Sequence, residues 1–173
     1  GDETATDLVA LTRSVAYVLG AEARRRGITI QTALPAADAV APVRGTVGSW
    51  QTIVFNLLLN AVAHTPTGAA VDVRVAPRAD GGARFETRNP GIIDPAVRSS
   101  LFDPFVGARA DGTGLGLALV AGRVAELGGA IAAEADDGDV LFRVDAPAAS
   151  SASSASPTSS PSSTSTASTE VRA

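Results

Sequence analysis

Three polar side chains recur at every fourth position within the otherwise apolar stretch 46–65. They are Asn56, Asn60 and His64. Residues four apart lie one turn above another on a helix, so these side chains would form a single stripe. Asparagine is unfavourable inside a helix because its side chain competes for backbone hydrogen bonds. The stripe therefore indicates either a ligand-binding edge or amides satisfied by a neighbouring loop, and this stretch by itself leaves both open.

A second candidate for chemistry is the glycine-rich run 111–117, in which Gly112, Gly114 and Gly116 alternate where a helix is expected to begin. Glycine lets a phosphate approach the backbone closely, and the following helix offers unpaired N–H groups to an anion. The run does not follow a strand in a βαβ unit, so it is not the dinucleotide-binding fingerprint. The chain also lacks the lysine of the common phosphate-binding loop. A flexible helix entry is the alternative interpretation.

The composition narrows the classes of function. The net charge of −4 gives no reason to expect binding to nucleic acid or to a membrane surface. With no cysteine and one histidine, the chain excludes disulfides, thiolate metal sites and multi-histidine metal sites. No apolar run approaches the ~18 residues of a spanning helix, and the first residues do not read as a signal peptide.

The last part of the chain differs from the rest. From Pro147 onward it consists almost entirely of Ser, Thr, Ala and Pro. Such a segment buries too little apolar surface to offset the entropy of ordering. We therefore predict one domain over residues 1–146 and a disordered tail over residues 147–173.

Hydrophobic periodicity predicts helices interleaved with antiparallel hairpins. Apolar residues have helical spacing, or a helix-start signal is present, in four segments: 6–26, 46–65, 94–102 and 114–127. Alternating patterns predict strands at 28–32, 39–43, 70–75, 83–87, 131–134 and 140–144. This order favours the α+β class and a two-layer sandwich over a doubly wound sheet.

Three motifs in sequence resemble the catalytic, ATP-binding domain of sensor histidine kinases. They are NLLLNAVAHTP from Asn56, LFDPF from Leu101 and GTGLGLALV from Gly112. That family shares its fold with DNA gyrase, a heat-shock chaperone and mismatch-repair ATPases. The resemblance extends from Leu8 to Asp145. It implies a mixed, mostly antiparallel sheet covered on one face by helices, with ATP and Mg²⁺ as ligands.

The resemblance also implies roles for individual residues. Asn60 matches the asparagine that holds magnesium, and His64 matches a position near the nucleotide. Asn56 stands where hydrolytic relatives carry a glutamate base; since an amide does not take up a proton near neutral pH, hydrolysis by water should be poor. Asn56 and Asn60 are thus the expected catalytic pair. The further expected nucleotide contacts are Thr87, Asn89, Gly91, Ile92, Phe105, Gly112, Thr113, Gly114, Leu115, Gly116 and Leu117.

Phe102 and Phe105 match the box flanking a mobile lid, expected at 106–111, although ordinary core packing is an equal alternative for both. The sequence departs from the family at the carboxylate that binds adenine. Depending on the alignment, Arg88 or Thr87 stands there, and neither is acidic. Losing that contact is expected to cost ~1.5–3 kcal/mol of binding free energy. A basic residue common in the family is replaced by Ala63, and we consider Arg109 a substitute.

The leading hypothesis is a protein-histidine kinase domain that donates the γ-phosphate of ATP to a histidine on a dimerisation domain absent from this chain, with a response-regulator receiver as the next partner. The alternatives are a degenerate nucleotide-binding or regulatory module and an anti-sigma-type serine kinase of the same fold. The isolated domain is expected to be monomeric, cytoplasmic and without contact to nucleic acid or membrane.

Overall fold

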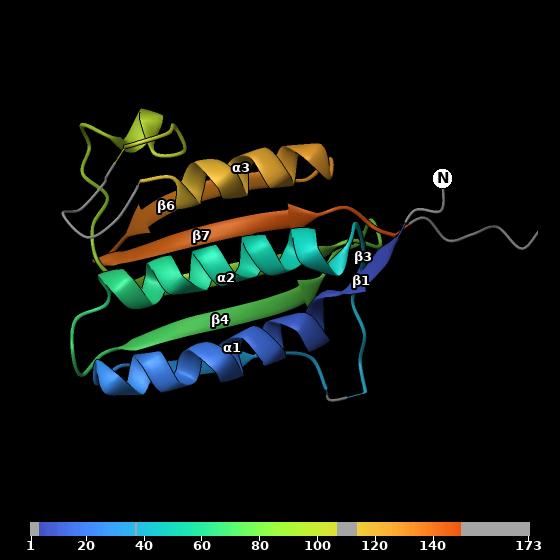
Figure 1. Ribbon diagram of the computed structural model, residues 1–173, viewed down its shortest axis with the longest axis horizontal. Coiled ribbons are helices and arrows are strands. Elements are labelled where there is room, and N and C mark those ends of the chain that lie inside the picture. The colour runs from blue at the N-terminus through green and yellow to red at the C-terminus, as the bar shows by residue number, and fades with distance from the viewer. Residues whose placement is uncertain (1–3, 37, 107–113, 150–173) are drawn as a thin grey trace, which may run out of the picture.

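The computed structural model describes residues 4–36, 38–106 and 114–149, and these form two layers (Figure 1). One layer is a five-stranded sheet in the order β2-β4-β5-β7-β6, and the other consists of the helices α1, α2 and α3 on one of its faces. The sheet strands are β2 (Thr29–Ala33), β4 (Ala70–Pro77), β5 (Ala83–Pro90), β6 (Ala130–Asp136) and β7 (Asp139–Ala146). The helices are α1 (Leu8–Arg25), α2 (Val47–His64) and α3 (Gly116–Glu126).

Strand pairing makes the sheet mixed. β2 runs parallel to β4, whereas β4–β5, β5–β7 and β6–β7 are antiparallel. Alternation decides which face is buried: Val71, Val73 and Val75 face the core, while Asp72 and Arg74 between them face solvent. The predicted α+β sandwich is therefore confirmed, with helices on one face.

The central helix α2 lies between α1 and α3 (Figure 1). Its N-cap, Thr46, accepts a hydrogen bond from the Ser49 backbone N–H at 3.2 Å. The core-facing side is fully buried along its length: Trp50, Ile53, Val54, Leu57, Leu58, Ala61 and Val62. Burying a continuous apolar stripe against the sheet stabilises this helix far more than its intrinsic propensity does.

The short helix predicted at 94–102 is wrong. The Asp94 carboxylate accepts a hydrogen bond from the Ala96 backbone N–H at 2.9 Å, but the chain then forms turns, with only a 3₁₀ turn at Arg98–Ser100. Asp94 closes a local turn of its own, and the apolar side chains of the segment that pack against the core, Leu101 and Phe102, are neighbours at its end, so the cap signal does not propagate into a helix.

A second, small sheet joins the two ends of the domain. β1 (Ala5–Asp7) pairs antiparallel with β3 (Pro42–Arg44). Residues 147–149 lie on the other side of β3, where the Arg44 N–H donates to the Pro147 carbonyl at 3.0 Å and the Ala149 N–H donates to the Pro42 carbonyl at 3.4 Å. The first helix was predicted to begin at Thr6; Thr6 and Asp7 belong instead to β1, and Asp7 is the N-cap of α1, its carboxylate accepting from the Val9 N–H at 3.0 Å.

None of the helices in the described part of the chain combines the length and the apolar character needed to cross a bilayer.

Candidate functional site

The polar stripe predicted on α2 exists and borders the buried face. Asn56 and Asn60 are half-buried and His64 is exposed. The Asn56 amide N–H₂ donates to the Thr52 carbonyl at 2.7 Å, which orients its oxygen outward from the helix. The Asn60 backbone carbonyl lies 3.1 Å from His64 Nδ1, a contact that leaves the Asn60 side-chain amide uninvolved.

The start of α3 meets this stripe. Gly116 is the first residue of α3, and a Cβ placed on it would lie 3.2 Å from the Asn56 side-chain oxygen. Glycine is thus required for the close approach of the two helices at this point. Leu115, the N-cap residue, makes no side-chain capping hydrogen bond, and the first backbone N–H groups of α3 have no acceptor among the described residues, as suits a helix end that receives a ligand.

Just before α3, a backbone hydrogen bond holds two turn residues together. The Phe105 N–H donates to the Gly114 carbonyl at 3.0 Å, and both residues have positive φ, 67° and 65°. Phe105 is 72% exposed, so the core-packing alternative does not hold for it. Phe102 does pack: its ring meets that of Phe142 edge-on, with the centroids 6.3 Å apart. Gly112, Thr113, Arg109 and most of the expected lid lie outside the described residues.

Two buried polar side chains lie at the end of β5. Thr87 is 0% exposed and Asn89 is 3% exposed, both on the face of β5 that the helices cover. The Asn89 N–H₂ donates to the Pro90 carbonyl at 3.0 Å. A Cβ on Gly91 would lie 3.5 Å from Val140, which the sequence analysis did not single out, and 3.6 Å from the Asn89 amide nitrogen. In the sequence, the only indication that Val140 faces this way is the alternation of apolar residues along 140–144.

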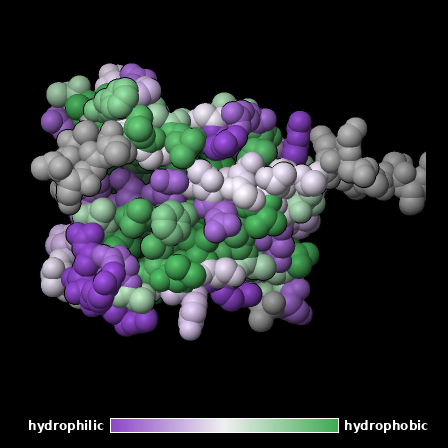
Figure 2. Space-filling view, viewed as in Figure 1, coloured by the Kyte–Doolittle hydropathy of each residue, from purple (hydrophilic) through white to green (hydrophobic). Residues whose placement is uncertain are grey.

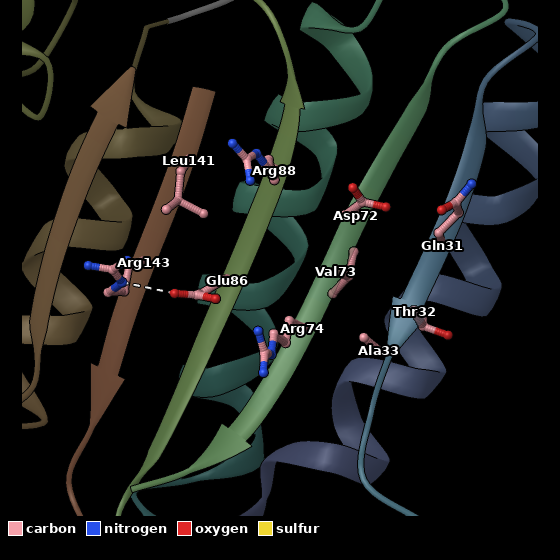
Figure 3. Close-up of a pocket in the computed structure, with 10 residues that line it drawn as sticks. All are labelled: Gln31, Thr32, Ala33, Asp72, Val73, Arg74, Glu86, Arg88, Leu141 and Arg143. Atoms are coloured by element: carbon pink, nitrogen blue, oxygen red, sulfur yellow. Dashed lines mark hydrogen bonds and ion pairs between the residues drawn. The ribbon is translucent and has the colours of Figure 1, made fainter. Parts of the chain in front are cut away.

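The structure distinguishes Thr87 from Arg88. Arg88 points to the opposite, open face of the sheet, where its guanidinium donates to Asp139 at 2.9 Å. Figure 3 shows it there with Glu86 and Arg143, on the side away from the helices. Ile92 is 86% exposed beyond the strand end, and Leu115 is also exposed, whereas Leu117 packs against the core.

Topology brings these segments to one end of the domain. α2 ends at His64 and leads into β4, and Asp72 near the start of β4 pairs with Arg88 near the end of β5. The end of β5 therefore lies beneath the C-terminal half of α2, which packs on β5. The Gly116–Asn56 contact places the start of α3 at the same end. Asn56, Asn60, Thr87 and Asn89 thus belong to one region, together with the first turn of α3.

The open face of the sheet carries a separate arrangement of charges. Arg84 donates to both oxygens of Asp145, at 2.7 and 3.0 Å, and Arg143 bridges Glu86 and Glu134 at 2.9 and 3.0 Å. The hydrogen bonds from Arg84 hold the pKa of Asp145 below its usual range. Because these charges are paired across strands, they neutralise one another on the sheet surface and contribute modestly to its stability.

Figure 2 shows the helix-covered side of the molecule, where apolar side chains gather over the helices. Phe55 and Leu59 on α2 are each 36% exposed, and Leu119 on α3 is 47% exposed. Among the described residues there is no group of three or more His, Asp or Glu side chains that would hold a metal ion without a further ligand.

Comparison with known proteins gives consistent results. The family described as histidine kinase-, DNA gyrase B- and HSP90-like ATPase matches residues 46–150. The chain is 35% identical over 121 residues to the sensory histidine kinase/phosphatase NtrB of Rhodobacter capsulatus, covering 62% of this chain and 34% of that protein. It is 36% identical over 115 residues to the sensor histidine kinase TrcS of Mycobacterium tuberculosis, covering 61% of this chain and 23% of that protein.

Among solved structures, full-length ShkA in complex with AMPPNP superimposes with a TM-score of 0.72 at 31% identity, covering 85% of this chain and 31% of that one. The chain therefore spans about a third or less of the length of each of these three proteins.

Proposed function

Because this chain belongs to the histidine kinase-, DNA gyrase B- and HSP90-like ATPase family, we propose that it is the ATP-binding catalytic domain of a sensor histidine kinase. In this proposal the domain binds Mg²⁺-ATP and presents the γ-phosphate to a histidine on another domain. The observation that carries it is the contact between Asn56 on α2 and Gly116 at the start of α3, which brings an amide stripe against an uncapped helix N-terminus.

The residues present fit a magnesium–nucleotide complex. Asn60 offers a hard amide oxygen, and one protein ligand together with phosphates and waters is ordinary coordination for magnesium. A bound magnesium ion neutralises phosphate charge and orients the γ-phosphate. The free N–H groups of α3 suit phosphate oxygens, and the positive end of the helix dipole adds to their attraction.

In this proposal the chain's own residues position the nucleotide and form no covalent bond to it. Asn56 has no proton-accepting group at neutral pH, and its amide is already held by the Thr52 carbonyl. Water is therefore poorly activated, and the γ-phosphate is kept for a nucleophile supplied by the partner. The acceptor would be a histidine, and a receiver domain would follow it.

The proposal places the domain in the cytoplasm, where ATP is found, and treats the isolated chain as a monomer. The exposed apolar residues Phe55, Leu59 and Leu119 support contact between the helical face and the phosphoacceptor domain, since apolar groups on one face mark interaction surfaces.

The test is calorimetric titration of the chain with a non-hydrolysable ATP analogue, first with magnesium and then with a chelator. We expect magnesium-dependent binding in the micromolar to sub-millimolar range. Asn60→Ala should weaken it by at least about tenfold, as loss of a ligand worth ~1.5–3 kcal/mol requires. Gln51→Ala, an exposed position on the same helix, is the matched control and should leave the affinity unchanged. Unchanged affinity in the Asn60 variant would remove this residue from the site.

One observation favours a second candidate, a member of the family without kinase activity. In the part of the chain that the structure describes, the helix-facing side at the end of β5 carries Thr87 and Asn89 and no carboxylate. A domain of this kind would still fold, because its core is intact. No binding at millimolar nucleotide would favour this candidate.

A further inference from the structure

The hydroxyl of Thr87 is unusual among the buried polar groups of this domain. Its oxygen is buried and has no hydrogen-bond partner among the described residues. Buried hydroxyls are nearly always paired, so an exception at a candidate site indicates a missing partner. Thr12 on α1 is a second such case, but α1 lies on the far side of α2 from α3 (Figure 1) and outside the region described above.

Asn89 continues the same row. It stands two residues along β5 on the same face, and its amide N–H₂ uses one hydrogen in the bond to the Pro90 carbonyl. Its amide oxygen and second N–H remain for another partner. Together the two side chains place a hydroxyl and an amide at the end of β5, on the face that α2 covers.

The surroundings of this row suit a flat aromatic ligand. Phe142 pairs with Thr87 across β5 and β7, and Phe102 packs edge-on against Phe142. Val140 adjoins Gly91 and Asn89. Access requires an outward shift of residues 91–106, a segment whose described structure consists of turns and one 3₁₀ turn and which leaves Ile92 86% exposed.

The donor and acceptor types decide which base is accepted. Adenine presents an amino donor at the position where guanine presents a carbonyl acceptor. A carboxylate only accepts, so at that position it would bind the amino group of adenine and repel the carbonyl oxygen of guanine. A threonine hydroxyl rotates to donate or to accept, and the Asn89 amide, held by the Pro90 carbonyl, still offers an oxygen acceptor and one N–H donor. They therefore pair with either base.

Building on the proposed nucleotide-binding function, we propose that this domain binds purine nucleotides without strong discrimination, so that GTP as well as ATP is a ligand. Thr87 and Asn89 are the residues that set this specificity. The proposal concerns only the base, and the phosphate region formed by α3 and the asparagine stripe serves both nucleotides equally.

The experiment compares non-hydrolysable ATP and GTP analogues, each titrated calorimetrically into the chain with magnesium. We expect dissociation constants within about tenfold of each other. Binding of the ATP analogue with the GTP analogue more than a hundredfold weaker would overturn this inference and leave the proposed function intact. Binding of neither analogue at millimolar concentration would overturn both.

Variants separate base recognition from a structural effect. Asn89→Asp replaces the amide with an acceptor of the same shape, which cannot donate to the Pro90 carbonyl; it should lower the thermal midpoint somewhat and shift the preference toward the ATP analogue by at least tenfold. Thr87→Val keeps the volume but removes the hydroxyl; it should weaken both analogues about equally and should not lower the thermal midpoint. If Asn89→Asp folds and keeps the same nucleotide preference, Asn89 does not contact the base and the inference fails.

Arg88→Gln is the matched control. It lies between the two residues in sequence but on the open face of the sheet, where it pairs with Asp139. Its affinities for both analogues should equal those of the unmodified chain. A changed preference in this control would show that any alteration of β5 perturbs the site, which would also overturn the assignment to Thr87 and Asn89.

Discussion

At the residue scale, the site depends on how closely two helices approach at single atoms. Gly116 lies against the Asn56 side-chain oxygen, and a methyl group there would be at 3.2 Å, tighter than ordinary packing. Asn56 is itself held by the Thr52 carbonyl. Small changes at this contact should therefore affect nucleotide binding more than they affect folding.

We expect Gly116→Ala to weaken binding of an ATP analogue several-fold, because Asn56 must give way by a few tenths of an ångström. The matched control is Gly122→Ala in the same helix, where a Cβ meets nothing within 4 Å. That control should raise the free energy of unfolding by about 0.5–1 kcal/mol through lower backbone entropy in the unfolded chain, and it should leave binding unchanged. Calorimetry and urea unfolding of the two variants measure both effects. Equal affinities for the two variants would contradict this account of the contact.

A second glycine is needed for the fold rather than for the site. Gly45 has a φ of 119°, and a Cβ on it would lie 2.5 Å from a Leu127 methyl group and 3.1 Å from the Trp50 indole nitrogen. Gly45→Ala should lower the free energy of unfolding by at least about 2 kcal/mol from backbone strain and overpacking. Urea unfolding monitored by fluorescence of Trp50, the one tryptophan of the chain, measures this. Gly48→Ala, which meets nothing within 4 Å, is the control and should not destabilise.

At the scale of elements, the alternating sequence of β5 places its side chains on two different faces of the sheet. Its odd-numbered residues face the helices and the candidate site, while Arg84, Glu86 and Arg88 face solvent. The solvent-facing residues form cross-strand ion pairs with β7. Their charges therefore affect the stability of the sheet and not the chemistry of the site.

Asp145 makes the stability of this sheet dependent on pH. Hydrogen bonds from Arg84 lower the pKa of Asp145 from 3.8, and partial burial opposes this shift without reversing it. A folded-state pKa below the unfolded value stabilises the fold fully above about pH 4 and loses that contribution as the pH falls through the folded pKa. We therefore expect Asp145→Asn to lower the thermal midpoint at pH 7 and to show a smaller further loss than the unmodified chain on acidification to pH 3.

The measurement for Asp145 is thermal unfolding at both pH values. Asp72→Asn on the same open face is the comparison variant, since no ion pair of Asp72 is found among the described residues. If the two variants lose the same stability at pH 7, the Arg84–Asp145 pair contributes nothing measurable to the stability of the fold. Many surface ion pairs behave in this way.

At the scale of the whole molecule, the two ends of the domain meet at β3. β1 pairs on one side of it and residues 147–149 pair on the other. The predicted limit of the domain, after residue 146, therefore leaves out backbone hydrogen bonds that the fold makes. The disorder predicted for the tail remains a prediction, since residues 150–173 lie outside the described part of the chain.

Truncation tests where the domain ends. A chain ending at Ala149 should unfold at the same urea midpoint as the full chain. A chain ending at Ala146 loses the hydrogen bonds of Pro147 and Ala149 with β3, and its free energy of unfolding should fall by about 1–3 kcal/mol. If both truncated chains unfold at the same urea midpoint, residues 147–149 do not stabilise the domain, and the limit predicted from composition, after residue 146, is correct.

The sequence by itself determined the elements whose signals are local and repeated. The apolar spacing of residues 46–65 and the alternation of residues 70–75 and 83–87 each decide which side of an element is buried, because burial must follow the period of the backbone. For the same reason, the four-residue spacing of Asn56, Asn60 and His64 correctly predicted that they lie along one side of the helix. The helix at 94–102 was predicted wrongly because its single cap signal was followed by two adjacent packed residues, Leu101 and Phe102, and not by packed residues at helical spacing.

Only the tertiary structure decided which segments meet. The choice between Thr87 and Arg88 depends on which face of β5 the helices cover, and a two-residue period leaves that choice to the packing of distant elements. Residues far apart in the sequence are joined by the contact of Gly116 with Asn56, by the Phe102–Phe142 pair and by the hydrogen bonds of residues 147–149 with β3. Such contacts depend on the relative placement of whole elements, and no local pattern of residues encodes that placement.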